Sequence, residues 1–64
     1  MWVVFRRVSN LIVAEAWKEL LEDAGIPAQI RWEHPGSRED ALATCNVMVP
    51  NSRLHVAEQV ASRS

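Results

Sequence analysis

The side chains that could bind a metal are His34, Cys45 and His55, with Glu33 and Asp40 near the first of them in sequence. Protein zinc sites usually hold such ligands at tight, repeated spacings, and this sequence has none of those spacings. His34 ends an expected strand and Cys45 opens the next, so the loop between them could bring these two side chains together. We therefore expect no cofactor. A small-molecule or metal sensor that uses the His34–Cys45 loop is the alternative function.

Nucleophilic catalysis is a second chemistry that a cysteine and a histidine could perform together. Such catalysis needs a third group that orients the basic histidine. It also needs hydrogen-bond donors that stabilise an oxyanion, and the sequence indicates neither feature. Both glycines, Gly25 and Gly36, have turn or cap roles, so the sequence contains no glycine-rich phosphate loop. A chain of 64 residues rarely encloses the pocket of roughly 300 Å³ or more that small molecules occupy. We therefore expect that the protein is not an enzyme.

Length and composition favour one domain, residues 1–64, with a marginal core. A chain of this size buries only about 60% of the surface that its unfolded form exposes. Such domains gain support from disulfides, a metal or association, and Cys45 is the only cysteine, so association remains. The lone thiol favours a reducing compartment and hence a cytoplasmic location. The net charge of −1 argues against nucleic acid as a partner, and the apolar runs are too short to span a membrane.

Alternation and helical periodicity predict the elements that would position these residues. Residues 1–8 are rich in β-branched and aromatic residues, which is typical of a strand. Residues 10–24 have the clearest helical period, with Ser9 or Asn10 as the N-cap and Gly25 after the end. With Ser9 as the cap, Val8 and Val13 would form a hydrophobic staple. The face expected to be buried consists of Val13, Ala14, Ala16, Trp17, Leu20, Leu21 and Ala24. Leu11 and Ile12 fall in the charged arc, and we expect them to pack under the loop over residues 34–44.

The second half of the chain predicts two further strands and a helix. Residues 28–33 alternate between apolar and polar, and residues 45–49 form a strand that ends at Pro50. Ser37 could cap a helical turn through residue 44, and Asn51 or Ser52 caps a second helix. Strand, helix, strand, strand, helix is a ferredoxin-like half without its fourth strand. We therefore predict an α+β domain with sheet order 1-3-2 and two helices on one face.

The absence of a fourth strand leaves the outer edge of the first strand free. That edge is strongly β-prone and contains no proline, and arginines stand only at its far end. By alternation, either Trp2 and Val4 or Val3 and Phe5 lie on the open side of the sheet, together with Met48. An apolar patch beside an unpaired edge is more often a docking surface than an accident. The alternatives are that the N-terminus covers its own sheet or that the patch is tolerated. The predicted partner-binding residues are Trp2, Val3, Val4, Phe5, Arg6, Arg31 and Met48.

A protein partner, either a second copy or a larger subunit, fits this surface better than single-stranded nucleic acid. Arginines beside Trp2 resemble the surfaces on which bases stack. The central strand, however, offers Val47, Met48 and Val49 in place of the aromatic residues that such platforms use. Arginine with tryptophan also describes a protein interface hot spot, which we prefer.

The chain resembles a family of small bacterial domains of unknown function described as prokaryotic signal-transducing proteins. The residues that carry the resemblance are Asn10-Leu11, Ala14-Glu15, Lys18, Leu20-Leu21-Glu22, Ala24-Gly25-Ile26-Pro27-Ala28, Val47-Met48-Val49-Pro50 and Ala57-Glu58. The resemblance implies a ferredoxin-type half-sheet with two helices and a regulatory or accessory role in signal transduction. It carries over no catalytic or ligand residues. The chain departs from the family in its short second helix and in a middle loop that is not glycine-rich.

Overall fold

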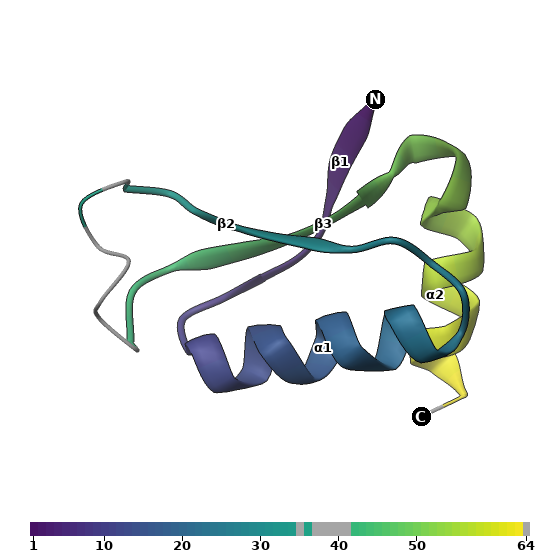
Figure 1. The fold of residues 1–64 in the computed structure, drawn as a ribbon, viewed down its shortest axis with the longest axis horizontal. Helices are drawn as coiled ribbons and strands as arrows, with labels where there is room; N and C mark the ends of the chain where they lie inside the picture. The colour runs from purple at the N-terminus through teal and green to yellow at the C-terminus, as the bar shows by residue number, and fades with distance from the viewer. Residues whose placement is uncertain (35, 37–41, 64) are drawn as a thin grey trace.

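The computed structural model describes residues 1–34, 36 and 42–63 (Figure 1). In chain order these form strand β1 (Trp2–Val8), helix α1 (Leu11–Asp23), strands β2 (Gln29–Trp32) and β3 (Cys45–Pro50), the short 3-10 helix η2 (Asn51–Arg53) and helix α2 (Leu54–Ser62). The predicted α+β class and the order of the elements are confirmed. The helical turn predicted over residues 37–44 lies mostly outside the described residues.

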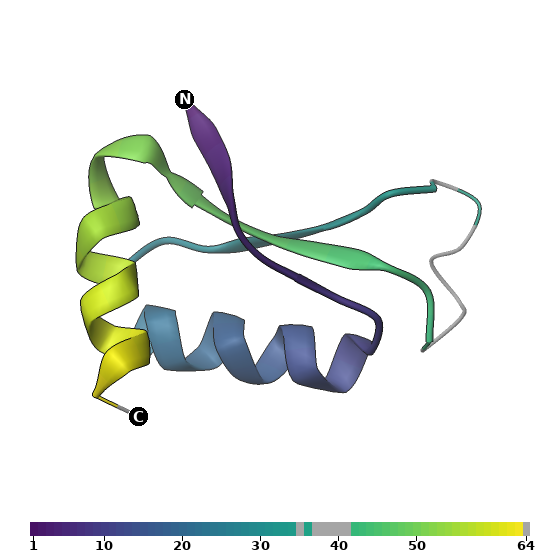
Figure 2. The ribbon, with the colours of Figure 1, turned by 180° about the vertical axis from the view of Figure 1, so that it is seen from behind.

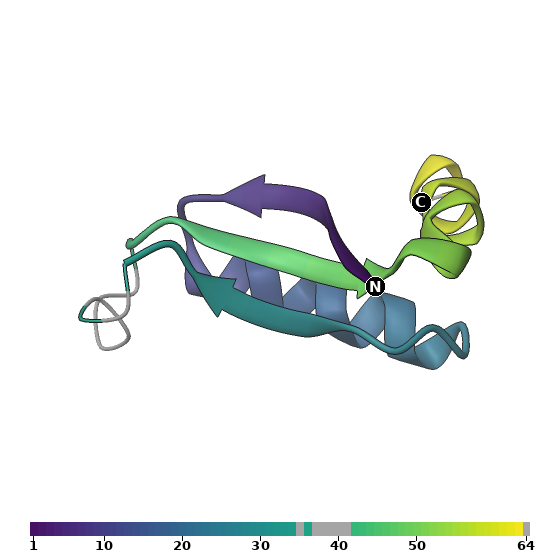
Figure 3. The same ribbon diagram turned by 90° about the horizontal axis from the view of Figure 1, so that it is seen from above.

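β3 is the central strand of a three-stranded antiparallel sheet of order β1-β3-β2, as predicted. Both helices pack on one face of this sheet, and α1 passes beneath all three strands when the molecule is seen from above (Figures 1 and 3). Their apolar residues meet those of the strands in a single buried cluster. No described helix covers the opposite face, which we call the open face of the sheet (Figure 2).

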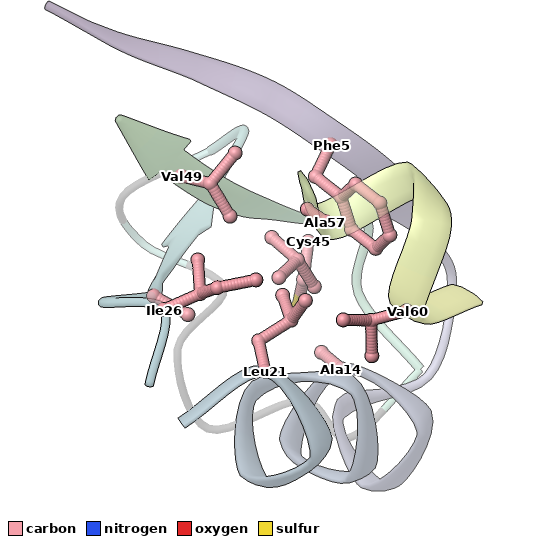
Figure 4. Close-up of a cluster of buried hydrophobic side chains, with 10 residues drawn as sticks. Phe5, Ala14, Leu21, Ile26, Cys45, Val49, Ala57 and Val60 are labelled. Atoms are coloured by element: carbon pink, nitrogen blue, oxygen red, sulfur yellow. The ribbon is translucent and has the colours of Figure 1, made fainter. Parts of the chain in front are cut away.

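The core lies between the sheet and the two helices (Figure 4). β3 contributes the residues of one face, Cys45, Val47 and Val49, and these are fully buried. Helix α1 contributes Ala14 and Leu21, while Ala57 and Val60 come from α2. The predicted assignment of Val47 and Val49 to the core is therefore confirmed.

Of the two N-caps that the sequence allowed, Ser9 and Asn10, the structure selects Asn10. Asn10 is the N-cap, and its side chain accepts a hydrogen bond from the backbone N–H of Ile12 at 2.8 Å. The sequence predicted a staple between Val8 and Val13 only with Ser9 as the cap, so that alternative does not apply. Val13 is instead 42% exposed.

The buried face of α1 is also rotated from the predicted one. Leu11 packs against the core, although its position in the charged arc predicted a place under the loop. Ala16 and Ala24 are exposed, although both were assigned to the buried face, and Ile12 is 73% exposed. The apolar arc of this helix is wider than the stripe that the sheet can cover, so one margin of the arc stays in solvent.

The end of α1 is a Schellman motif, as the sequence predicted. The backbone N–H of Ile26 donates to the carbonyl of Leu21 at 2.9 Å, and the N–H of Gly25 donates to the carbonyl of Glu22 at 3.0 Å. Gly25 has a φ of +82°, a conformation that side-chain-bearing residues rarely adopt. The motif turns the chain so that Ile26 is buried in the same core cluster as Leu21.

Replacing Gly25 with alanine is expected to lower the free energy of unfolding by about 1–2 kcal/mol, the cost of a left-handed backbone for a residue with a Cβ. No atom lies within 4 Å of the Cβ position, so the effect should come from the backbone alone. Chemical denaturation measures it. Gly36→Ala is the matched control, because its Cβ position is equally open and its φ is not positive. An equal loss in both variants would contradict the assignment.

The second helix begins without the predicted side-chain cap. Neither Asn51 nor Ser52 caps α2 with its side chain. Instead, Pro50 ends β3 in an extended conformation and the chain enters the 3-10 turn η2, which leads into α2. The prediction that Asn51 or Ser52 caps the helix through its side chain is therefore wrong.

Candidate functional site

Strand β1 is an edge strand whose inner side pairs with β3. In the described part of the chain, no strand pairs with its outer side. The backbone N–H of Asn51 also donates to the carbonyl of Met1 at 2.7 Å, so the inner pairing extends to the start of the chain. The N-terminal end of the strand projects away from both helices (Figures 1 and 2). A free row of backbone donors and acceptors is a template for pairing with another strand.

A β-bulge divides β1 into two parts. Val4 pairs with Met48 and Arg6 pairs with the next residue of β3, Val47, so that Phe5 is the extra residue. The bulge breaks the alternation and directs both Phe5 and Arg6 toward the helices. Strict alternation along residues 2–7 gave no sign of it.

Arg6 is held on the helix side by four contacts. Its Nη1 donates to Oε1 of Glu58 in α2 at 2.7 Å and to the carbonyl of Phe5 at 2.9 Å. Its guanidinium lies 4.1 Å from the ring centre of Phe5 and 5.4 Å from that of Trp17, and these two rings meet edge to face. Arg6 was predicted to be part of the docking surface. In the structure it instead ties β1 to α2 and satisfies the carbonyl at the bulge.

The first part of β1, residues 2–4, contributes to an apolar half of the open face. Val3 pairs with Val49 and faces the core, so Trp2 and Val4 lie on the open side with Met48 and Pro50. Val4 is 50% exposed, and the other three are half-buried. Of the two alternatives that the sequence left open, the structure places Trp2 and Val4 outward. Val3 packs against the core and Phe5 is only 6% exposed, so their side chains do not line this face.

The other half of the open face is polar. Arg7 and Arg31 flank Asn46 in the register of the three strands. Arg7 spans the face to reach Glu33 with two hydrogen bonds, Nε to Oε1 at 2.7 Å and Nη2 to Oε2 at 2.9 Å. The hydrogen bond from Arg7 lowers the pKa of the Glu33 carboxyl and raises the pKa of the arginine. Arg31 is exposed and has no ion pair within the described residues.

The predicted ligand pair, His34 and Cys45, is divided between the surface and the core. Cys45 is fully buried, its Sγ contacts the carbonyl of Ala43 at 3.4 Å, and burial raises the pKa of its thiol. His34 is exposed. His55, on α2, is exposed and lies 3.2 Å from the side chain of Gln59. No three potential metal ligands gather in the described residues, while Asp40 lies outside them.

None of the helices in the described part of the chain has the length and apolar character needed to cross a membrane.

Comparisons with protein-family models, with curated proteins and with solved structures found no match.

Proposed function

We propose that this chain is a small, non-enzymatic regulatory or accessory protein that binds a protein partner through the free edge of β1 and the open face of the sheet. The observation that carries the proposal is the position of Trp2, Val4 and Met48. These apolar side chains lie together beside an unpaired strand edge, and no described helix covers them. Uncovered apolar patches of this kind mark interaction sites in many small proteins.

The chemistry of the face favours protein over nucleic acid. Arg7 is neutralised by Glu33, which leaves Arg31 as the unpaired arginine of the described open face. Trp2 offers a ring on the edge strand, but Val4 beside it and Met48 on the central strand present aliphatic groups, which pack against other side chains and cannot stack bases. A partner that places apolar side chains on Trp2, Val4 and Met48 and a carboxylate near Arg31 would complement the face.

The regulatory role and the cytoplasmic location rest on sequence features. The resemblance to the signal-transducing bacterial domains supports a regulatory or accessory role. The single, unpaired Cys45 supports a reducing compartment such as the cytoplasm.

Met48→Lys is the sharpest test of the open face, because residue 48 lies on the central strand, away from both edges. Immobilised wild-type protein is expected to capture a specific protein from an extract of expressing cells. The captured protein is then purified, and its affinity is measured by calorimetry. Burying a lysine in an apolar interface should weaken binding by about tenfold or more, as loss of a hot-spot residue does.

Ile12→Lys is the matched control, since it adds the same charge to an exposed aliphatic position on α1. It should bind the partner as the wild type does. The proposal fails if the purified pair does not bind, or if the two lysine variants bind equally well.

A further inference from the structure

We infer that the segment that pairs with the free edge of β1 is the same edge of a second copy of this chain, in an antiparallel arrangement about a two-fold axis at Val3. The inference rests on the proposed function, because it names the partner of that edge. The product would be a continuous six-stranded sheet with the helices of both copies on one face.

The bulge sets the length of the edge that can pair. The bulge at Phe5 and Arg6 interrupts the regular strand, and the guanidinium of Arg6 donates a hydrogen bond to the carbonyl of Phe5. Bulges and charged side chains are the devices that keep edges from pairing. Residues 2–4 have neither device, and their end of the strand projects away from the helices (Figure 1). The pairing segment is therefore short and is centred on Val3.

The segment is complementary to itself in this register. With the axis at Val3, Trp2 of one copy lies opposite Val4 of the other, and the two Val3 residues face each other. Trp2 and Val4 both point to the open face, so aromatic and β-branched side chains pair on that side, a favourable cross-strand combination. The two Val3 side chains meet on the core side. No polar side chain enters the joint.

The charges beside the edge also permit a second copy. Arg6 is paired with Glu58 and Arg7 with Glu33, so the two cationic residues of β1 are neutralised within each chain. The two-fold axis at Val3 places the Arg6 residues of the two copies at opposite ends of the joint. Two copies therefore approach without the repulsion that free arginines would impose.

The size of the joint sets the strength of the dimer. A stable interface buries about 800 Å² on each partner, which is close to a fifth of the 4293 Å² surface of this chain. Pairing of residues 2–4 buries less than that, so the dimer is weak. We expect a dissociation constant of about 10–500 μM, in the range of small transient interfaces.

Sedimentation velocity of the full chain between about 10 μM and 1 mM tests the dimer, because this range spans the expected dissociation constant. The wild type should shift from monomer to dimer, and Val4→Lys should raise the dissociation constant about tenfold or more. Ile12→Lys should leave it unchanged, because Ile12 lies on α1 away from the joint. A wild type that stays monomeric at 1 mM, or two lysine variants with the same dissociation constant, would overturn the inference.

A cysteine at the axis tests the register. In Val3→Cys the two new thiols are expected to face each other at the Cα separation of directly opposed residues, about 4.5–5.5 Å, within disulfide range. Mild oxidation should then cross-link the variant to a dimer, while Ile12→Cys should stay largely monomeric. Cys45 is buried and does not compete. No cross-link in Val3→Cys at concentrations where the wild type is dimeric would rule out this register.

The dimer and the proposed function can fail separately. A monomeric wild type that still binds a protein partner in a Met48-dependent way contradicts the dimer and leaves the proposed function standing.

Discussion

Replacing Leu21 with alanine is expected to lower the free energy of unfolding by about 3 kcal/mol, within the range measured for buried leucines. Leu21 has no exposed surface and points from α1 toward the sheet, into the cluster that joins both helices to β3 (Figure 4). Its removal deletes apolar burial and leaves a cavity inside this cluster. A domain of 64 residues is stable by about 3–10 kcal/mol, so this one change removes a large share of the total.

Urea denaturation followed by tryptophan fluorescence measures the change, since Trp17 packs against the core. Ile12→Ala is the control: it also removes aliphatic carbons from α1, but from a side chain that is 73% exposed. It should alter the free energy of unfolding by no more than about 0.5 kcal/mol. A loss below about 1 kcal/mol in Leu21→Ala would mean that the helix does not rest on this residue.

The parts of the fold that were predictable from sequence depend on contacts between near neighbours in the chain. The Schellman ending needs only Gly25, the carbonyls of the preceding turn and an apolar residue at position 26. The half-buried strand over residues 28–33 was readable from the alternation of Ala28, Ile30 and Trp32 with polar neighbours. The strand order followed from the right-handed crossover of the first βαβ unit and the insertion of β3 between β1 and β2.

The features that the sequence did not reveal depend on contacts between distant segments. The bulge at Phe5 is stabilised by Trp17 from α1 and by the ion pair of Arg6 with Glu58, which is 52 residues away. Which part of the wide apolar arc of α1 is buried depends on where the sheet lies over the helix. No periodicity within one element contains that information, so Leu11 was misplaced.

The sequence predicted some of the side chains that line the open face, and the structure excludes others that were predicted to lie there. Alternation limited the outward residues of β1 to two sets, and the pairing of Val3 with the core residue Val49 selects Trp2 and Val4. Arg6 was grouped with the docking residues because it follows them in sequence. The bulge reverses its direction, and Glu58 then binds it. Sequence alone offered no sign that a glutamate of the last helix would face the first strand.

The thiol of Cys45 is expected to react with a thiol reagent, such as an aromatic disulfide that releases a coloured thiolate, at least about 100-fold more slowly in the folded protein than an exposed thiol does. Cys45 is fully buried and burial raises the pKa of its thiol, so little thiolate forms and no reagent reaches it. Ile12→Cys combined with Cys45→Ser supplies the exposed thiol for comparison at the same pH. Because the unfolded thiol has its ordinary, lower pKa, a rise in pH past that value favours unfolding and accelerates the reaction further.

The rate of this reaction also distinguishes the two functions considered for the chain, a docking protein and a sensor built on the His34–Cys45 loop. If Cys45 reacts only through global unfolding, the Leu21→Ala variant should accelerate the reaction by about 150-fold, the factor that corresponds to a loss of about 3 kcal/mol. If instead the reaction is fast in the wild type and insensitive to Leu21→Ala, then local opening next to β3 exposes the thiol to solvent without global unfolding. Such opening is what a sensor built on the His34–Cys45 loop requires, whereas a docking protein needs the thiol to stay in the core that holds the sheet rigid behind its open face.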